Sequence, residues 1–202
     1  NPPNTANDNE FSHGTHCAGI SSATTDNALG IASIGFKTKI IAVKCTKDGP
    51  YTGSIDAGYQ GVDYAMAAGA RIISMSWGGG APSATEQDLF DAAHAAGIVL
   101  ICAAGNDNTD NPMYPASYDY AISVAASDED DKKADFSNYG ATIDVTAPGV
   151  DIWSTVATTN DSYFSYSGTS MACPLVSGVA ALILAYDPGM PPDKVEECIK
   201  TT

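Results

Sequence analysis

Four short apolar runs rich in β-branched residues alternate along the chain with segments whose apolar residues recur at helical spacing. The runs cover residues 40–45, 71–76, 98–103 and 121–125. Runs of this length without polar alternation are typical of strands buried on both faces. Such strands occur in parallel sheets that carry helices on each side, so the pattern strongly restricts the fold.

The segments between these runs predict the helices that cover the sheet. Their apolar residues recur at helical spacing, as Ile55, Tyr59, Val62 and Met66 in one and as Leu89, Phe90, Ala93 and Ala96 in the other. Gly69 and Gly97 follow them, where glycine commonly ends a helix. We also expect a long helix over residues 170–186 and a short one over 192–200. Strand–helix–strand order repeated in this way predicts an α/β fold with a mainly parallel sheet.

Length and charge narrow the class of protein further. The chain has 202 residues, 44% of them hydrophobic, which suits a single domain over residues 1–202. Its formal net charge of −15 disfavours nucleic acid and anionic membranes as partners. The longest apolar stretch, residues 178–186, is too short to cross a bilayer. Because Asn1 is neither an initiator methionine nor preceded by a leader, we expect a processed product or a fragment.

Two short motifs carry candidate chemistry. HGTH at residues 13–16 places a histidine before a run of small, helix-compatible residues, and GTSMA at residues 168–172 places Ser170 at the start of the long apolar helix. A serine hydroxyl becomes a good nucleophile when a base removes its proton, and imidazole is the usual base near neutral pH. The pattern therefore indicates a Ser–His pair brought together by folding.

Each motif also has an ordinary interpretation. A serine at this position is commonly a helix cap, and a single histidine is commonly a core or surface group. Four residues of metal-ligand type also fall in these regions without a recognised ligand spacing, namely His13, His16, Cys17 and Cys173.

Two glycine-rich segments follow expected strands and indicate a binding face. SWGGG at residues 76–80 follows the second strand, and AAGND at residues 103–107 follows the third. Chemistry in open parallel sheets gathers beyond the carboxyl ends of the strands, and glycine lets another backbone approach closely.

Six motifs in order resemble one family over nearly the whole chain. They are HGTH followed by CAG, SWGG, AAGND, YPA, APG and GTSMACP. This order and spacing is similar to that of the subtilisin family of serine endopeptidases, and the cysteine after HGTH resembles the proteinase K branch. The resemblance implies a three-layer α/β fold, here shortened at the N-terminus and slightly at the C-terminus.

The resemblance also implies roles for three residues. His13 matches the general base of the family, and Ser170 matches its nucleophile. Asn106 matches the side-chain donor of the oxyanion hole, with the backbone N–H of Ser170 as the second donor. A serine at a helix N-terminus fits this chemistry, because unpaired N–H groups and the positive end of the helix dipole lie beside the developing oxyanion.

The same resemblance implies a substrate site and a cation site. A peptide would pair with the backbone of Ser76, Trp77 and Gly78, while Ala103, Ala104 and Gly105 would form one wall of an apolar primary pocket with Met113 near its base. Asp144 matches a carboxylate that binds calcium or another cation together with backbone carbonyls, here those of Ala116, Tyr118 and Ala121. Asp144 has a second interpretation as an aspartate in a turn at a strand end. Catalysis in the family needs no cofactor.

The chain departs from the family pattern where the third catalytic residue should lie. The family order is Asp, His and Ser, and Asp8 and Glu10 are the only carboxylates before His13. Both belong to a polar segment without a preceding strand, so we expect the strand that carries the catalytic aspartate to be absent. Residues 1–202 alone should then be weak or inactive. A second departure concerns Cys17 and Cys173, whose thiols we expect to lie close to the catalytic pair.

For the parent protein we expect protein or peptide substrates, a propeptide, a monomeric state and an extracellular location. The competing interpretation is a degenerate member of the family that acts as a binding or structural module. A serine esterase of another fold is disfavoured because the chain has no G-x-S-x-G motif.

Overall fold

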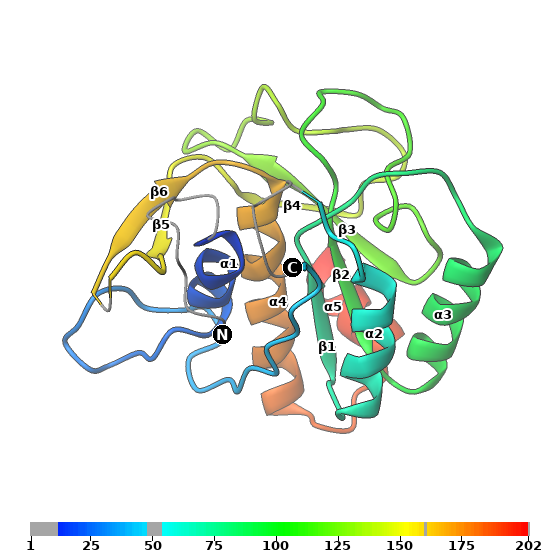
Figure 1. The fold of residues 1–202 in the computed structure, drawn as a ribbon, viewed down its shortest axis with the longest axis horizontal. Coiled ribbons are helices and arrows are strands. Elements are labelled where there is room, and N and C mark those ends of the chain that lie inside the picture. The colour runs from blue at the N-terminus through cyan, green and yellow to red at the C-terminus, as the bar shows by residue number, and fades with distance from the viewer. Residues whose placement is uncertain (1–11, 48–53, 160, 202) are drawn as a thin grey trace.

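The computed structural model describes residues 12–47, 54–159 and 161–201, and it has helices on both sides of a central sheet (Figure 1). The elements run in the order α1 (His13–Ser22), α2 (Gly58–Ala67), β1 (Ile72–Met75), α3 (Ala84–Ala95), β2 (Val99–Ala103), β3 (Ala121–Ser127), β4 (Val145–Pro148), β5 (Ile152–Thr155), β6 (Tyr163–Tyr166), α4 (Thr169–Tyr186) and α5 (Pro192–Lys200).

The central sheet is parallel throughout, with the strand order β1-β2-β3-β4. Ile72 pairs with Val99, Leu100 with Ala121 and Val124 with Val145. Three of the predicted strands are confirmed as β1, β2 and β3, and the predicted α/β class is confirmed with them. The helices predicted over 170–186 and 192–200 are α4 and α5, with bounds that agree to within one residue.

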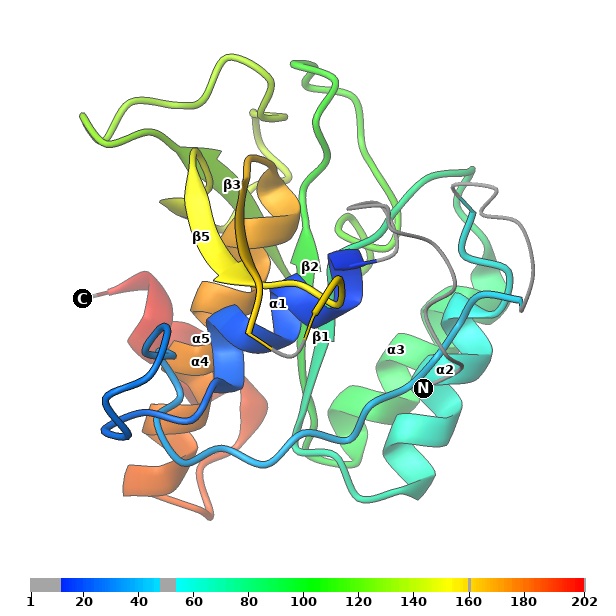
Figure 2. The ribbon, with the colours of Figure 1, turned by 60° about the vertical axis from the view of Figure 1, so that its left-hand side comes forward.

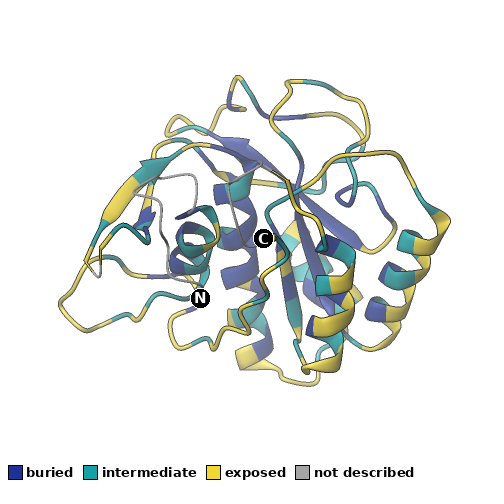
Figure 3. Ribbon diagram, viewed as in Figure 1, coloured by how far each residue is buried: buried dark blue, intermediate teal, exposed yellow. Residues whose placement is uncertain are grey.

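Strand β2 is buried on both faces, which explains its continuous apolar sequence. Val99, Ile101 and Ala103 belong to a core shared with α4 and α5, whereas Leu100 and Cys102 belong to a second core shared with α2 and α3. Strands β2 and β3 are buried along their whole length and are accordingly dark blue when the fold is coloured by burial (Figure 3). Helix α4 has the length and mean hydropathy of a membrane span, and 56% of it is buried in the protein.

The predicted strand over residues 40–45 is wrong, because the structure forms no strand there. A strand requires a hydrogen-bonded neighbour, and no described strand pairs with this segment. Ile40 and Ile41 are 51% and 43% exposed, and the carbonyl of Cys45 accepts hydrogen bonds from the N–H groups of Asp56 and Ala57. Apolar β-branched residues were therefore not enough to specify a strand here.

Strands β5 and β6 form an antiparallel hairpin outside the main sheet, and the hairpin holds α1. Ser154 Oγ donates to the carbonyl of His16 at 2.7 Å, and Thr155 Oγ1 donates to that of Thr15 at 3.0 Å. A Cβ atom at Gly19 would overlap both of these hydroxyl groups. Glycine at position 19 therefore allows the close contact between α1 and β5 (Figure 2).

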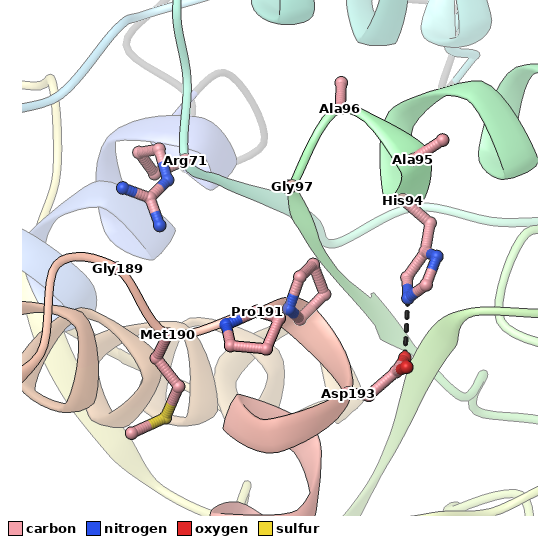
Figure 4. A pocket seen from close by; sticks show the side chains of 10 residues that line it. Arg71, His94, Ala95, Ala96, Gly97, Gly189, Met190, Pro191 and Asp193 are labelled. Atoms are coloured by element: carbon pink, nitrogen blue, oxygen red, sulfur yellow. Dashed lines mark hydrogen bonds and ion pairs between the residues drawn. The ribbon is translucent and has the colours of Figure 1, made fainter.

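Helices α3 and α5 meet beyond the amino ends of β1 and β2, at a cavity of about 630 Å³ (Figure 4). His94 Nε2 lies 2.6 Å from Asp193 Oδ1, and the His94 ring stacks on Tyr120 with 3.9 Å between centroids. Arg71 Nη1 donates to the carbonyl of Pro188 at 2.8 Å. These contacts join the two helical layers at the end of the sheet opposite the carboxyl ends of its strands.

Replacing Gly19 with alanine should destabilise the protein, because the added methyl group must displace the hydroxyl groups of Ser154 and Thr155. We expect the free energy of unfolding to fall by about 1–3 kcal/mol, as for other overpacked sites. Urea denaturation measures the change. The matched control is Gly14→Ala in the same helix, where none of the described residues lies within 4 Å of the new methyl group. An equal loss of stability in both variants would contradict the explanation.

Candidate active site

The carboxyl ends of β1 and β2 and the amino ends of α1 and α4 converge on one region. Ser76 follows β1, Ala104 follows β2, Ser170 lies in the first turn of α4 and His13 begins α1. Parallel strands present their carboxyl ends at one edge of a sheet, and α4 crosses the sheet so that its first turn reaches this edge. The topology therefore brings together residues from distant parts of the chain.

Ser170 is fixed by a reciprocal exchange of hydrogen bonds with Ser76. Ser170 Oγ donates to the carbonyl of Ser76 at 3.3 Å, and Ser76 Oγ donates to the carbonyl of Ser170 at 2.8 Å. Position 170 also lies within the first four residues of α4, whose N–H groups have no partner inside the helix. The hydroxyl of Ser170 thus stands beside donors that favour negative charge.

The amide of Asn106 is held in a single orientation by Thr169. Asn106 Oδ1 accepts from the N–H of Thr169 at 2.9 Å and from Thr169 Oγ1 at 3.0 Å. Among the described residues, Asn106 Nδ2 has no acceptor, and it lies 3.5 Å from the position that a Cβ atom at Gly168 would occupy. The exposed Asn106 therefore presents an N–H donor beside the first turn of α4.

Asn138 organises the loop that carries Asn106. It is 2% exposed, and its Nδ2 donates to the carbonyl of Ala104 at 2.8 Å. Its Oδ1 accepts from the N–H groups of Asp107 at 2.9 Å and Thr109 at 3.3 Å. Sequence reasoning missed Asn138, because an asparagine in a polar segment gives no sign that it will be buried.

Cys17 links His13 to Ser170. Its Sγ lies 4.0 Å from His13 Nδ1 and donates to the carbonyl of Ser170 at 3.3 Å. Burial raises the pKa of Cys17 to about 12, so the thiol is neutral. No direct hydrogen bond joins His13 to Ser170 within the described residues. The expected closeness of Cys17 to both residues is confirmed by these contacts.

Burial lowers the pKa of His13 below its ordinary value, and the neighbouring His16 lowers it further. The imidazole is therefore neutral at neutral pH and can accept a proton. Asp8 and Glu10, the carboxylates that precede His13 in the sequence, lie outside the described residues. The described residues place no carboxylate in contact with this ring.

Met113 lies between the two segments expected to line the primary pocket. Its Cγ and Sδ are 3.2 Å from the position of a Cβ atom at Gly78, and its Sδ is 3.0 Å from the corresponding position at Gly105. The ring of Trp77 makes an edge contact with Tyr59, with 5.2 Å between ring centroids. Met113 is thus the side chain placed to fill the space between Gly78 and Gly105.

Asp144 does not offer a free carboxylate to a cation. Its Oδ1 forms an ion pair with Lys200 Nζ at 2.6 Å, and its Oδ2 accepts from the N–H of Ser123 at 2.8 Å. The carbonyl of Tyr118, one of the expected ligands with those of Ala116 and Ala121, accepts a hydrogen bond from the N–H of Ala121 at 3.2 Å. A cation would have to displace Lys200, so these residues, as placed, do not fit a calcium site.

Comparison with known proteins identifies the family to which this chain belongs. Residues 1–202 match the sequence profile of the Subtilase family. The chain is a subtilase. It is 46% identical over 171 residues to thermitase of Thermoactinomyces vulgaris, covering 85% of this chain and 60% of that protein. It is 37% identical over 194 residues to subtilisin DY of Bacillus licheniformis, covering 94% of this chain and 69% of that protein.

Solved structures support the same assignment. The subtilase chain superposes on a protease of Pseudoalteromonas arctica PAMC 21717 with a TM-score of 0.84 and 35% identity, covering 94% of this chain and 63% of that one. The prenylagaramide maturation protease PagA gives a TM-score of 0.78 and 31% identity, covering 92% of this chain and 70% of that one. The predicted subtilisin-like fold is therefore confirmed. The chain spans 60% of thermitase and 42% of a thermophilic serine proteinase of a Bacillus species.

The role of Thr169 in this subtilase can be tested with Thr169→Val, which keeps the shape of the side chain. The change removes a donor to Asn106 Oδ1 and leaves the N–H of Gly105, which donates to Thr169 Oγ1 at 3.1 Å, without its acceptor. We expect the free energy of unfolding to fall by about 1–3 kcal/mol in urea denaturation. The exposed Thr24→Val is the control. Unchanged stability of the Thr169 variant would show that this hydroxyl does not hold the loop.

Proposed function

We propose that this chain carries the catalytic machinery of a serine endopeptidase that hydrolyses peptide bonds by acyl transfer. The observation that carries the proposal is the arrangement of Ser170 and Asn106. Ser170 lies in the first turn of α4, and the locked amide of Asn106 presents a free donor beside that turn. This pairing of a nucleophile with preorganised donors suits a reaction that passes through an oxyanion.

Each residue has a distinct role in the proposed reaction. His13 removes the proton from Ser170 Oγ, which attacks the scissile carbonyl, and the protonated imidazole then gives the proton to the leaving amine. Asn106 Nδ2 and the N–H of Ser170 stabilise the oxyanion. Because burial and His16 lower the pKa of His13, the base stays neutral to a lower pH than an ordinary histidine. The reaction needs no cofactor.

The substrate would bind as an extended peptide along Ser76, Trp77 and Gly78, with a side chain entering the space between these residues and the wall formed by Ala103, Ala104 and Gly105. Met113 reduces the depth of that space. Because none of these seven residues is charged, the pocket favours apolar side chains. Protein or peptide substrates, a propeptide, a monomeric state and an extracellular location follow from the same proposal.

Fluorophosphonate labelling tests the proposal on the protein expressed from its whole coding sequence. We expect a covalent adduct on Ser170 and none in Ser170→Ala. Asn106→Ala should keep the fold and lower kcat by about 10²–10³, a loss measured for the corresponding change in a subtilisin. The alternative is a degenerate subtilase that binds without catalysis. Absence of labelling in a folded protein would favour this alternative and contradict the peptidase.

Residues 1–202 alone should hydrolyse casein weakly or not at all. An orienting carboxylate contributes roughly 10⁴ to turnover in enzymes with a Ser-His-Asp triad, and the described residues place none against His13. Casein hydrolysis by the purified polypeptide measures this, with Ser170→Ala as the control for contaminating peptidases. Robust hydrolysis that disappears in the control would show that the polypeptide has its full catalytic machinery.

Mercurial reagents should inhibit the active protein by modifying Cys17. A bulky group on its Sγ would displace both His13 Nδ1 and the carbonyl of Ser170, which lie 4.0 and 3.3 Å away. Peptidase activity after treatment with p-mercuribenzoate measures the effect, and Cys17→Ser should resist it. Full activity after complete labelling of Cys17 would contradict the expectation.

A further inference from the structure

His16 connects α1 to both strands of the β5–β6 hairpin. The residue is fully buried, its Nε2 donates to the carbonyl of Phe164 in β6 at 3.0 Å, and its ring stacks on Tyr166 with 4.4 Å between centroids. Its own carbonyl accepts from Ser154 Oγ in β5 at 2.7 Å. One residue of α1 is therefore bound to two neighbouring strands through its side chain and its backbone.

The contacts of His16 link the two parts of the chain that carry His13 and Ser170. His13 begins α1 and lies one helical turn before His16. Strand β6 ends at Tyr166, and the chain then runs through Gly168 to Ser170 in α4. The contacts of His16 with β6 thus join the helix that begins with His13 to the segment that leads into Ser170.

We propose that His16 is a positioning residue for His13, which fixes the first turn of α1 relative to the segment that carries Ser170. The proposal rests on the proposed function, because it assigns His13 and Ser170 to one reaction. His16 is fully buried and makes no hydrogen bond to Ser170 Oγ among the described residues, so its contribution comes through His13. Small shifts of a catalytic base cost reaction rate steeply, and a buried stack with a hydrogen bond limits such shifts.

The same location makes His16 an electrostatic neighbour of His13. The His16 ring is surrounded by α1, α4, β5 and β6. None of these elements contains Asp, Glu, Lys or Arg. Their other titratable side chains are Cys17 and Cys173 together with Tyr163, Tyr166 and Tyr186, which are neutral at neutral pH. The two imidazoles are therefore the only groups in these elements that gain charge near pH 6–7.

Two opposing effects act on the pKa of His16, and the larger one lowers it. Burial lowers the pKa of His16, while hydrogen bonding to the backbone of Phe164 and Ile152 offsets part of this effect. His16 Nδ1 is buried and makes no hydrogen bond with the described residues, so it holds a site for the second proton. A proton on His16 disfavours a proton on His13, which is the direction found for His13.

The test is an NMR titration of the three histidines, labelled with ¹³C at Cε1, in the folded Ser170→Ala protein. This background prevents self-digestion, and the readout needs no catalysis, so failure of the proposed function would not affect it. In the parent we expect the His13 signal to shift as His16 titrates, because two neighbouring imidazoles disfavour each other's charge. An uncharged His16 throughout the titration of His13 would overturn the electrostatic coupling.

His16→Gln separates the roles of the ring, because the glutamine Nε2 can still donate to Phe164 but the side chain lacks the ring that stacks on Tyr166 and cannot carry a charge. We expect the His13 midpoint to move to higher pH in this variant and the His13 signal to broaden as its turn loosens. His94→Gln, which removes the third histidine on α3, should leave the His13 signal unchanged. An unmoved His13 midpoint and linewidth in folded His16→Gln would show that His16 is only a packing residue.

Discussion

Burial of α4 against the parallel sheet is the interaction on which the rest of the structure depends. Its apolar residues form one core with β2, β3 and α5, and α1 packs on another part of its surface. This burial fixes the position of the first turn of α4 at the carboxyl edge of the sheet. Ser170 and Ser76 can exchange hydrogen bonds because the beginning of α4 lies beside the end of β1.

The helices and the buried strands could be predicted from the sequence, because their periods reflect local geometry. Apolar residues at helical spacing predicted α2 and α3, and continuous β-branched runs predicted β1 to β3. Residues 40–45 have the same composition and form no strand, since pairing depends on a neighbour that composition does not reveal. The β5–β6 hairpin was missed because Trp153, Tyr163 and Phe164 are partly exposed and do not alternate with polar residues.

In the candidate site, too, local sequence motifs could be recognised, whereas contacts between residues far apart in the sequence could not. The motifs located His13, Ser170 and Asn106, but they gave no sign of the groups that hold them. Asn138 reaches the Asn106 loop across 34 residues, and His16 reaches Phe164 across 148. Such contacts depend on tertiary packing, so a single sequence cannot show them. Asp144 gives the reverse case, in which Lys200 from α5 supplies the cation that the carboxylate binds.

The hydrogen bond between His94 and Asp193 makes the two ends of the sheet different. Helices α3 and α5 lie on opposite faces of the sheet, so their contact ties the two outer layers around the amino ends of the strands. At the opposite end, the glycine-rich loops after β1 and β2 are held to the first turn of α4 by hydrogen bonds of Ser76 and Asn106. The two ends of the sheet are therefore closed in different ways: the amino ends by a direct contact between helices of opposite layers, and the carboxyl ends by loops that are exposed at residues 78–80 and 106–108.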